Sequence, residues 1–134
     1  MSQGNVEIVR AVYREWALGN MKAGVELFDP GIAFESFMPD ADERVLATGV
    51  EEVESFMRDF LAQWRGFRIV AEDFQSAGDH MVFVVGRQTA TGRGSGIAVD
   101  DALYSVWTFR RGTVVRLLFD RDRRKALDAA GLPA

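Results

Sequence analysis

The chain has 134 residues, 48% of them hydrophobic and 11% aromatic, which is typical of one folded domain and excludes a disordered chain. Its formal net charge of −4, with both signs interspersed, argues against nucleic acid as a partner, because phosphate binding needs a basic surface. The absence of cysteine excludes disulfides, and the single histidine, His80, does not suffice for a typical zinc site. We therefore predict no metal and no cofactor.

No segment of the sequence indicates export or insertion into a membrane. The opening residues MSQGNVEIVR lack the basic segment and apolar run of a signal peptide. No stretch approaches the roughly 20 apolar residues that a membrane-spanning helix needs. We therefore expect a cytoplasmic protein without a membrane partner.

The first part of the chain is predicted to be helical. Apolar residues at helical spacing between Val6 and Trp16 predict a helix that ends at Gly19. Asn20 can then cap a short second helix, because its side chain can accept a hydrogen bond from a backbone N–H of the first turn. The apolar face of this second helix would consist of Met21, Val25 and Phe28.

A strand and a third helix follow. From Ile32 to Met38 apolar residues recur at every second position, which predicts a strand, and the polar residues 39–47 predict a loop. Thr48 and Glu51 have the spacing of a capping box. They precede the clearest helical stripe in the chain, which runs from Val53 to Trp64.

The second half of the chain is predicted to be mostly strand. Residues 68–74, 81–91, 97–110 and 113–120 are the four expected strands, and residues 122–130 form the last helix, which Gly131 ends. Within the third of these strands the paired carboxylates Asp100 and Asp101 predict a bulge. Arg111-Gly112 predicts a tight hairpin between the last two strands, and His80 is expected in an exposed turn.

The order of elements is therefore helix, helix, strand, helix, four strands and a short helix. Consecutive strands joined by short turns predict an antiparallel meander. Helices packed against such a sheet define an α+β fold, here a curved antiparallel sheet wrapped around helices. With no internal repeat or linker, residues 1–134 are predicted to be a single domain.

Three separated segments resemble the SnoaL-like branch of the nuclear transport factor two superfamily. They are VYREWALGN followed by ELFDPGIAFES, then VWTFRRGTVVRLLFD, then KALDAAGL. The resemblance implies a cone-shaped α+β fold with an apolar pocket between sheet and helices, and often a dimer through the outer sheet face. Relatives include polyketide cyclases, ketosteroid isomerases and limonene epoxide hydrolases, so the fold alone does not define an activity.

The composition of the later strands agrees with a dimer. Met81, Phe83 and Val85 alternate with further apolar residues, so both faces of this strand are apolar, whereas a sheet with one solvated face should alternate apolar and polar residues. A partner subunit covering the second face is one explanation. We therefore predict a homodimer through the outer sheet face.

The catalytic pattern of ketosteroid isomerases is absent from the matching positions. The resemblance places Val12 at the tyrosine of the first helix, Ser36 at the general base, and Ser105 near the second acid. Tyr13 lies one residue from the tyrosine position. Steroid isomerisation by that mechanism is therefore disfavoured.

The pattern of limonene epoxide hydrolases is present in part. Arg87 matches its arginine, but Thr89 stands where the family has aspartate. Asp120 lies near the third catalytic position, although another register places Leu117 there. We therefore do not predict epoxide hydrolysis.

Arg87 and Asp120 remain as candidate catalytic residues. Arg87 continues an apolar strand face, where a charge needs a partner, and Asp120 is a candidate for that partner or for a general base. Both residues also suit a structural salt bridge, and Asp120 could instead cap the last helix. Glu35 is a weaker candidate, and a metal site formed by Glu35 and the acidic residues 40–43 is disfavoured because acidic loops are usually solvated.

The expected pocket takes small hydrophobic ligands. Candidate lining residues are Trp16, Phe34, Ser36, Trp64, Phe83, Thr89, Ser105 and Trp107, and the aromatic residues among them also suit plain core positions. Two functions remain open. One is acid–base chemistry on a hydrophobic carbonyl substrate, and the other is a non-catalytic ligand-binding or dimerisation module.

Overall fold

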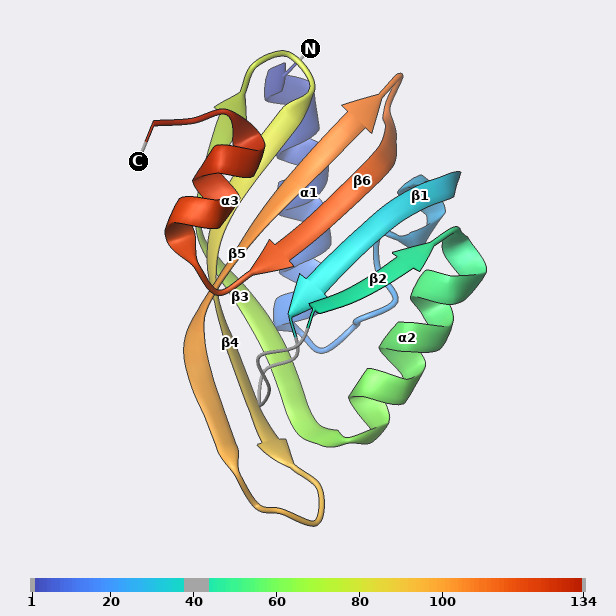
Figure 1. Ribbon diagram of the computed structural model, residues 1–134, viewed down its shortest axis with the longest axis vertical. Helices are drawn as coiled ribbons and strands as arrows, with labels where there is room; N and C mark the ends of the chain where they lie inside the picture. Colours follow the sequence, from blue (N-terminus) through green and yellow to red (C-terminus); the bar gives the residue numbers. More distant parts are fainter. Residues whose placement is uncertain (1, 38–43, 134) are drawn as a thin grey trace.

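A computed structural model describes residues 2–37 and 44–133 (Figure 1). Within these residues the chain forms three α-helices, one 3₁₀ helix and six strands. In chain order they are α1 (Ser2–Ala17), η1 (Val25–Leu27), β1 (Phe28–Phe37), β2 (Arg44–Thr48), α2 (Val50–Ala62), β3 (Trp64–Ala77), β4 (Met81–Gly92), β5 (Ala98–Arg110), β6 (Thr113–Asp120) and α3 (Arg123–Ala130).

The strands form one curved sheet in the order β2-β1-β6-β5-β4-β3. The antiparallel meander predicted for the second half is confirmed, since β3, β4, β5 and β6 pair antiparallel in sequence. Strand β1 joins β6 in parallel, with Phe34 opposite Leu117. The sheet is therefore mixed, because β1 enters it from a distant part of the chain instead of through a hairpin with β6.

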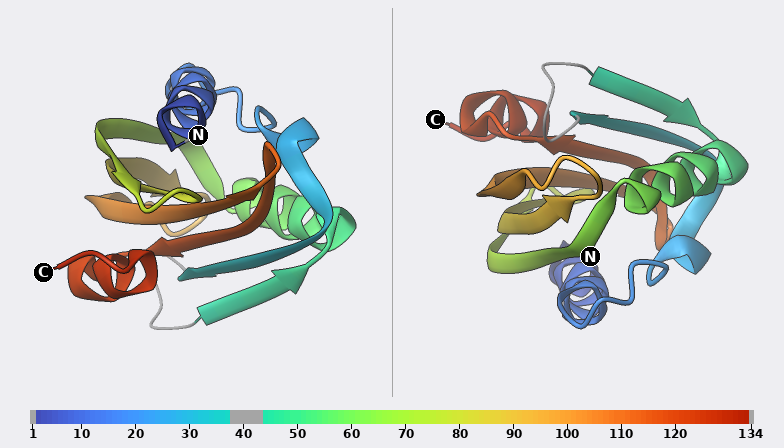
Figure 2. Two further views of the ribbon diagram at one scale, coloured as in Figure 1. Left: turned by 90° about the horizontal axis from the view of Figure 1, so that it is seen from above. Right: turned by 90° about the horizontal axis from the view of Figure 1, so that it is seen from below.

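Helices cover both faces of the sheet (Figure 2). Helices α1 and α2 pack on the face that we call the inner face, and α3 packs on the opposite, outer face, against β4, β5 and β6. Strand β4 shows the alternation: Val82 and Val84 belong to the large inner core, whereas Phe83 belongs to a smaller outer core with Leu127 of α3. Each face thus has its own hydrophobic cluster.

The predicted second helix is wrong except for one 3₁₀ turn. Gly24 adopts φ 94°, a left-handed conformation that interrupts a helix. The indole N–H of Trp16 donates to the carbonyl of Ala23 at 3.0 Å, which ties this turn to α1. The chain is extended from Phe28 onward, so β1 begins four residues before the predicted strand.

Around α2 the predicted boundaries also shift. Of the predicted loop, residues 39–43 lie outside the described residues, and Arg44–Thr48 is the edge strand β2. Gly49 is the N-cap of α2, and it is the side chain of Glu52 that accepts a hydrogen bond from the Thr48 N–H at 2.8 Å, so the expected Thr48–Glu51 box is wrong by one residue. Helix α2 ends at Ala62, and Trp64 already begins β3.

The later strands follow the prediction with one exception. No bulge occurs at Asp100 and Asp101, which pair regularly with Thr89 and Gln88. Asp100 accepts a hydrogen bond from Arg87 and Asp101 accepts one from the side-chain amide of Gln88, both on the neighbouring strand β4. Paired in this way, the two carboxylates do not disrupt the strand pairing. The irregularities of the β3–β4 pair lie in β3 instead.

The predicted hairpin before β6 and the predicted glycine end of α3 are confirmed, whereas the cap of α3 is Asp122 and not Asp120. Arg111 and Gly112 have φ 53° and 79°, as a two-residue hairpin with left-handed positions requires. At the other end, the side chain of Asp122 accepts hydrogen bonds from the backbone of the first turn of α3, and Gly131 ends the helix at φ 70°. His80 is exposed in its turn.

Candidate functional site

A cavity of about 440 Å³ lies between α2, the inner sheet face and the turn after α1. Its volume falls within the range of about 300–1,000 Å³ that small-molecule sites usually have. Most of its wall is apolar. The apolar residues of the wall are Trp16, Met21, Ala23, Val25, Phe28, Phe34, Val53, Phe56, Met57, Phe60, Leu61, Phe67, Ile69, Leu103, Leu117 and Phe119. Such a wall favours a ligand with a large apolar surface.

Five polar residues complete the wall, and they fall into two groups. Ser36 and Gln88 are buried, 9% and 3% exposed, and project from the inner faces of β1 and β4. Lys22, Glu54 and Arg58 are exposed, so their charges stand where the cavity meets solvent. The interior of the cavity therefore offers neutral hydrogen-bonding groups, and the charged groups are at its opening.

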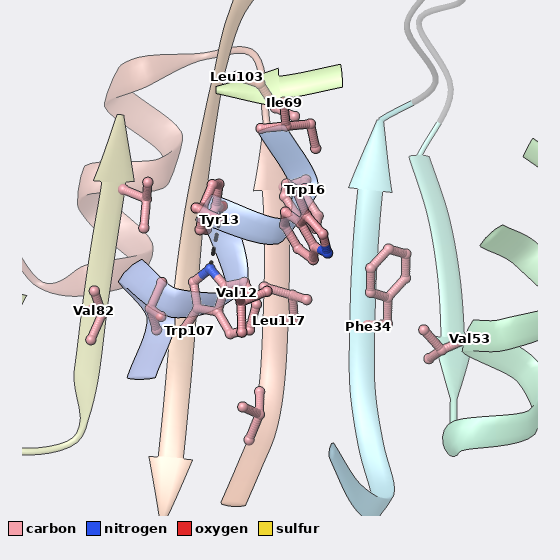
Figure 3. Close-up of a cluster of buried hydrophobic side chains, with 14 of the residues drawn as sticks. Val12, Tyr13, Trp16, Phe34, Val53, Ile69, Val82, Leu103, Trp107 and Leu117 are labelled. Carbon is pink, nitrogen blue, oxygen red and sulfur yellow. Dashed lines mark hydrogen bonds between the residues drawn. The ribbon is translucent and has the colours of Figure 1, made fainter. Parts of the chain in front are cut away.

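Three of the predicted pocket residues line this cavity: Trp16, Phe34 and Ser36. Figure 3 shows Trp16 of α1 and Phe34 of β1 extending into the space between the sheet and the helices. The Phe34 ring lies 5.5 Å from that of Phe56, which joins β1 to α2. Sequence periodicity had placed both aromatic side chains on the core faces of their elements.

Three others face away from the cavity or lie beside it. Trp64 is buried against Phe60, and its indole N–H is a buried donor without a partner among the described residues. Phe83 lies on the outer face, where its ring stacks on that of Tyr104 at 6.2 Å. Thr89 is exposed on the same outer face. The expectation that these residues line the pocket is not met.

Ser105 and Trp107 belong to a buried polar cluster with Tyr13, behind the cavity wall. The Tyr13 hydroxyl and Ser105 Oγ are 2.5 Å apart, and the Trp107 indole donates to Ser105 Oγ at 3.1 Å. The same indole N–H also donates to the Tyr13 hydroxyl at 3.4 Å, the contact drawn in Figure 3. Burial raises the pKa of Tyr13 to about 12, against a smaller opposing effect of these hydrogen bonds. The cluster joins α1 to β5 and does not border the cavity.

Arg87 lies on the outer face and does not line the cavity. Its side chain is 48% exposed and pairs with Asp100 on β5 at 2.6 Å. The predicted pairing with Asp120 does not occur, because Asp100 and not Asp120 lies next to Arg87 on the neighbouring strand. At this exposure the ion pair contributes little to stability.

Asp120 is buried, 1% exposed, but it also projects from the outer face and does not line the cavity. Its carboxylate accepts from Arg44 Nη2 at 3.2 Å and from the Asp122 backbone N–H at 2.8 Å. Arg44 also pairs with Glu35, so Glu35 belongs to the same outer ionic cluster. Asp120 thus holds the start of α3 and edge strand β2 in place, and Asp122, not Asp120, caps the helix.

Sequence reasoning missed Gln88, the most buried polar residue of the cavity wall. It placed Phe83 and Thr89 in the pocket, whereas Val82 and Val84 are the residues that face inward. Because residues 81–85 are all apolar, a period of two does not tell which parity faces the pocket. Because of this error of one residue, the prediction placed Arg87 on the pocket face, where the structure has its neighbour Gln88.

Two features are absent from the described residues. No three histidine, cysteine, aspartate or glutamate side chains among residues 2–37 and 44–133 are grouped as metal ligands. Within the same residues no helix has the length and apolarity needed to traverse a bilayer.

The SnoaL-like domain family matches residues 9–117, so the chain belongs to this family. Solved structures agree on the fold. The protein Bal32a, from a soil-derived mobile gene cassette, is 25% identical over 96% of each chain, with a TM-score of 0.76. A protein from Jannaschia sp. CCS1, named as a SnoaL-like polyketide cyclase, is 21% identical, covering 99% of this chain and 95% of its own, with a TM-score of 0.73.

A third solved structure contains a ligand. A Catenulispora acidiphila protein with a ketosteroid isomerase-like fold, in complex with trimethylamine, is 19% identical, covering 95% of this chain and 94% of its own, with a TM-score of 0.71. At this identity the likeness shows the fold alone. No curated protein matches the chain.

Proposed function

We propose that this protein binds a small hydrophobic molecule in the cavity between α2 and the inner sheet face. The observation that carries the proposal is a cavity of about 440 Å³ whose buried wall is apolar except for Ser36 and Gln88. Burial of an apolar ligand there is favourable, since each Å² of apolar surface removed from water contributes about 25 cal/mol. The trimethylamine complex of the Catenulispora protein supports small-molecule binding as a use of this fold.

Binding without catalysis is the better account of the described residues. Arg87 and Asp120, the candidates for acid–base chemistry, both lie on the outer face. The carboxylate on the cavity wall is that of Glu54, which is exposed at the opening. The Jannaschia protein is named as a polyketide cyclase, and a proton transfer of that kind in this chain would depend on Glu54 because a base must reach the substrate.

Filling the cavity tests the binding proposal. Met57 is a half-buried residue of α2 on the cavity wall, and Met57→Trp places a larger side chain in the ligand space. We expect naphthalene to bind the unmodified protein, measured by isothermal titration calorimetry, and Met57→Trp to weaken binding by about tenfold or more through steric exclusion. Met81→Trp is the matched control, since Met81 is equally half-buried but packs in the outer core.

Two outcomes contradict the proposal: no binding of naphthalene, or equal weakening of naphthalene binding by both tryptophan variants.

The same samples separate binding from catalysis. In D₂O, proton NMR follows deuterium exchange next to the carbonyl of 2-tetralone, and we expect no acceleration above buffer. An acceleration that Glu54→Gln removes would favour acid–base chemistry instead.

A further inference from the structure

The side-chain amide of Gln88 is the best-positioned polar group inside the cavity. Gln88 lies on the inner face of β4, is 3% exposed and belongs to the cavity wall. Ile69 lies opposite Gln88 on β3, and Leu103 and Phe67 belong to the same wall. A hydrogen-bonding group in such apolar surroundings gains strength when paired and costs free energy when left unpaired.

Asp101 determines which way this amide points. Asp101 is directly opposite Gln88 in the β4–β5 ladder, and its Oδ1 lies 2.9 Å from Gln88 Nε2. A carboxylate only accepts hydrogen bonds, so the amide nitrogen and not the oxygen must face Asp101. The second carboxylate oxygen is 3.8 Å from Arg121 Nη1, so the carboxylate also pairs with a cation.

With the nitrogen held by Asp101, the carbonyl oxygen of Gln88 points away from β5. No donor among the described residues bonds to Gln88 Oε1. Among the described residues, Trp64 Nε1 is the side-chain atom that is both fully buried and without a hydrogen-bond partner. Gln88 Oε1 also lacks a partner but does not belong to that class, so it is not sealed inside the protein. Gln88 Oε1 therefore borders the cavity as an acceptor that a ligand or water can satisfy.

We propose that Gln88 selects ligands that carry a hydrogen-bond donor, a hydroxyl or N–H, on an otherwise apolar skeleton. Gln88 Oε1 accepts from that donor, and Asp101 is a positioning residue that holds the amide in the accepting orientation. This inference rests on the proposed binding function. It narrows the ligand class from any apolar molecule to phenols, alcohols and N–H compounds, in preference to molecules that only accept hydrogen bonds.

Three naphthalene compounds test the selection: naphthalene, 2-naphthol and 2-methoxynaphthalene. They share one apolar skeleton, but only 2-naphthol can donate a hydrogen bond. By calorimetry we expect the unmodified protein to bind 2-naphthol about three- to tenfold more tightly than naphthalene or 2-methoxynaphthalene, the usual contribution of one hydrogen bond. Gln88→Leu should remove this preference, because leucine has a similar size but can neither donate nor accept a hydrogen bond.

Asp101→Ala tests the positioning role through a residue that is 40% exposed at its side chain and is not on the cavity wall. Without the carboxylate the amide is free to turn, so we expect the ratio of 2-naphthol to 2-methoxynaphthalene affinity to fall toward one. A merely structural effect would change the affinity for all three compounds alike. Thr91→Ala, on β4 outside the cavity wall, should keep the full ratio.

The outcomes distinguish the two proposals. If naphthalene and 2-naphthol both fail to bind, the binding function and this inference fall together. If naphthalene binds and Met57→Trp blocks it, but 2-naphthol has no advantage or keeps it in Gln88→Leu, the binding function stands and the role of Gln88 is overturned. Equal affinity for 2-methoxynaphthalene and 2-naphthol overturns it as well, because the amide N–H would then serve as the recognising group.

Discussion

At the scale of single residues, Tyr13, Ser105 and Trp107 form a polar cluster inside the core. Its three polar groups satisfy one another inside the core, at distances of 2.5 to 3.4 Å. The Tyr13 ring also packs edge-on against those of Phe74 and Trp107. Because the cluster does not border the cavity, we assign it a role in stability and not in ligand binding. The raised pKa of the buried Tyr13 phenol then makes this stability depend on pH.

Tyr13 should make the protein sensitive to alkaline pH. Its pKa rises from an ordinary value of about 10 to about 12 in the folded state. Between these values the unfolded chain loses the phenol proton while the folded chain keeps it, so the free energy of unfolding falls as pH rises. The loss is about 1.4 kcal/mol per pH unit and about 2–3 kcal/mol in all.

Urea denaturation at pH 9 and pH 12 measures this effect, with Tyr13→Phe as the reference that cannot titrate. The unmodified protein should lose about 2–3 kcal/mol more than the variant between the two pH values. Equal losses in both proteins would show that other groups cause the alkaline sensitivity and that Tyr13 does not.

At the scale of elements, α3 accounts for the apolar outer face of the sheet. Its buried residues Ala126, Leu127 and Ala130 pack on an outer cluster that includes Phe83 and Leu118. The side chain of Asp122 caps its first turn, which fixes where the helix starts. The helix shields these strands within the same chain, on the opposite side of the sheet from α1 and α2 (Figure 2). No residue of α3, which is described from Arg123 to Ala130, lines the cavity.

Leu127→Ala should lower stability without changing ligand binding. Leu127 is 4% exposed, and truncation of such a leucine costs about 2–5 kcal/mol through lost burial and the space left behind. Thermal and urea unfolding measure the loss, and Asp128→Ala, an exposed position on the same helix, should stay within about 0.5 kcal/mol of the unmodified protein. A large loss of naphthalene affinity at 25 °C in folded Leu127→Ala would contradict the separation of α3 from the cavity.

At the scale of the whole molecule, the homodimer through the outer sheet face remains a prediction. The apolar outward residues that suggested it are covered by α3. Val70 of β3 stays 50% exposed next to Arg87 on that face, and a dimer should bury it. Sedimentation equilibrium should give the mass of two chains, and Val70→Asp the mass of one. A single-chain mass for the unmodified protein would overturn the prediction.

Much of the fold was predictable because the signals were local. The stripe from Val53 to Phe60, the Arg111–Gly112 hairpin and the Gly131 cap each depend on residues a few positions apart. The edge strand Arg44–Thr48 was not predictable in the same way. It is a strand because it pairs with β1, a contact that its own composition does not indicate.

Some residues of the candidate site were likewise predictable from the sequence, and others were not. The amino-acid sequence by itself determined the α+β class, the family resemblance, and the aromatic residues Trp16 and Phe34 of the cavity wall. Only the tertiary structure decided that Gln88 faces the cavity and that Arg87 and Asp120 do not. The physical reason is that α3 covers the outer face of β4, so the residues on both faces of this strand are apolar. The alternation of residues along the strand then does not show which face is inner, and only the packing on both sides of the sheet does.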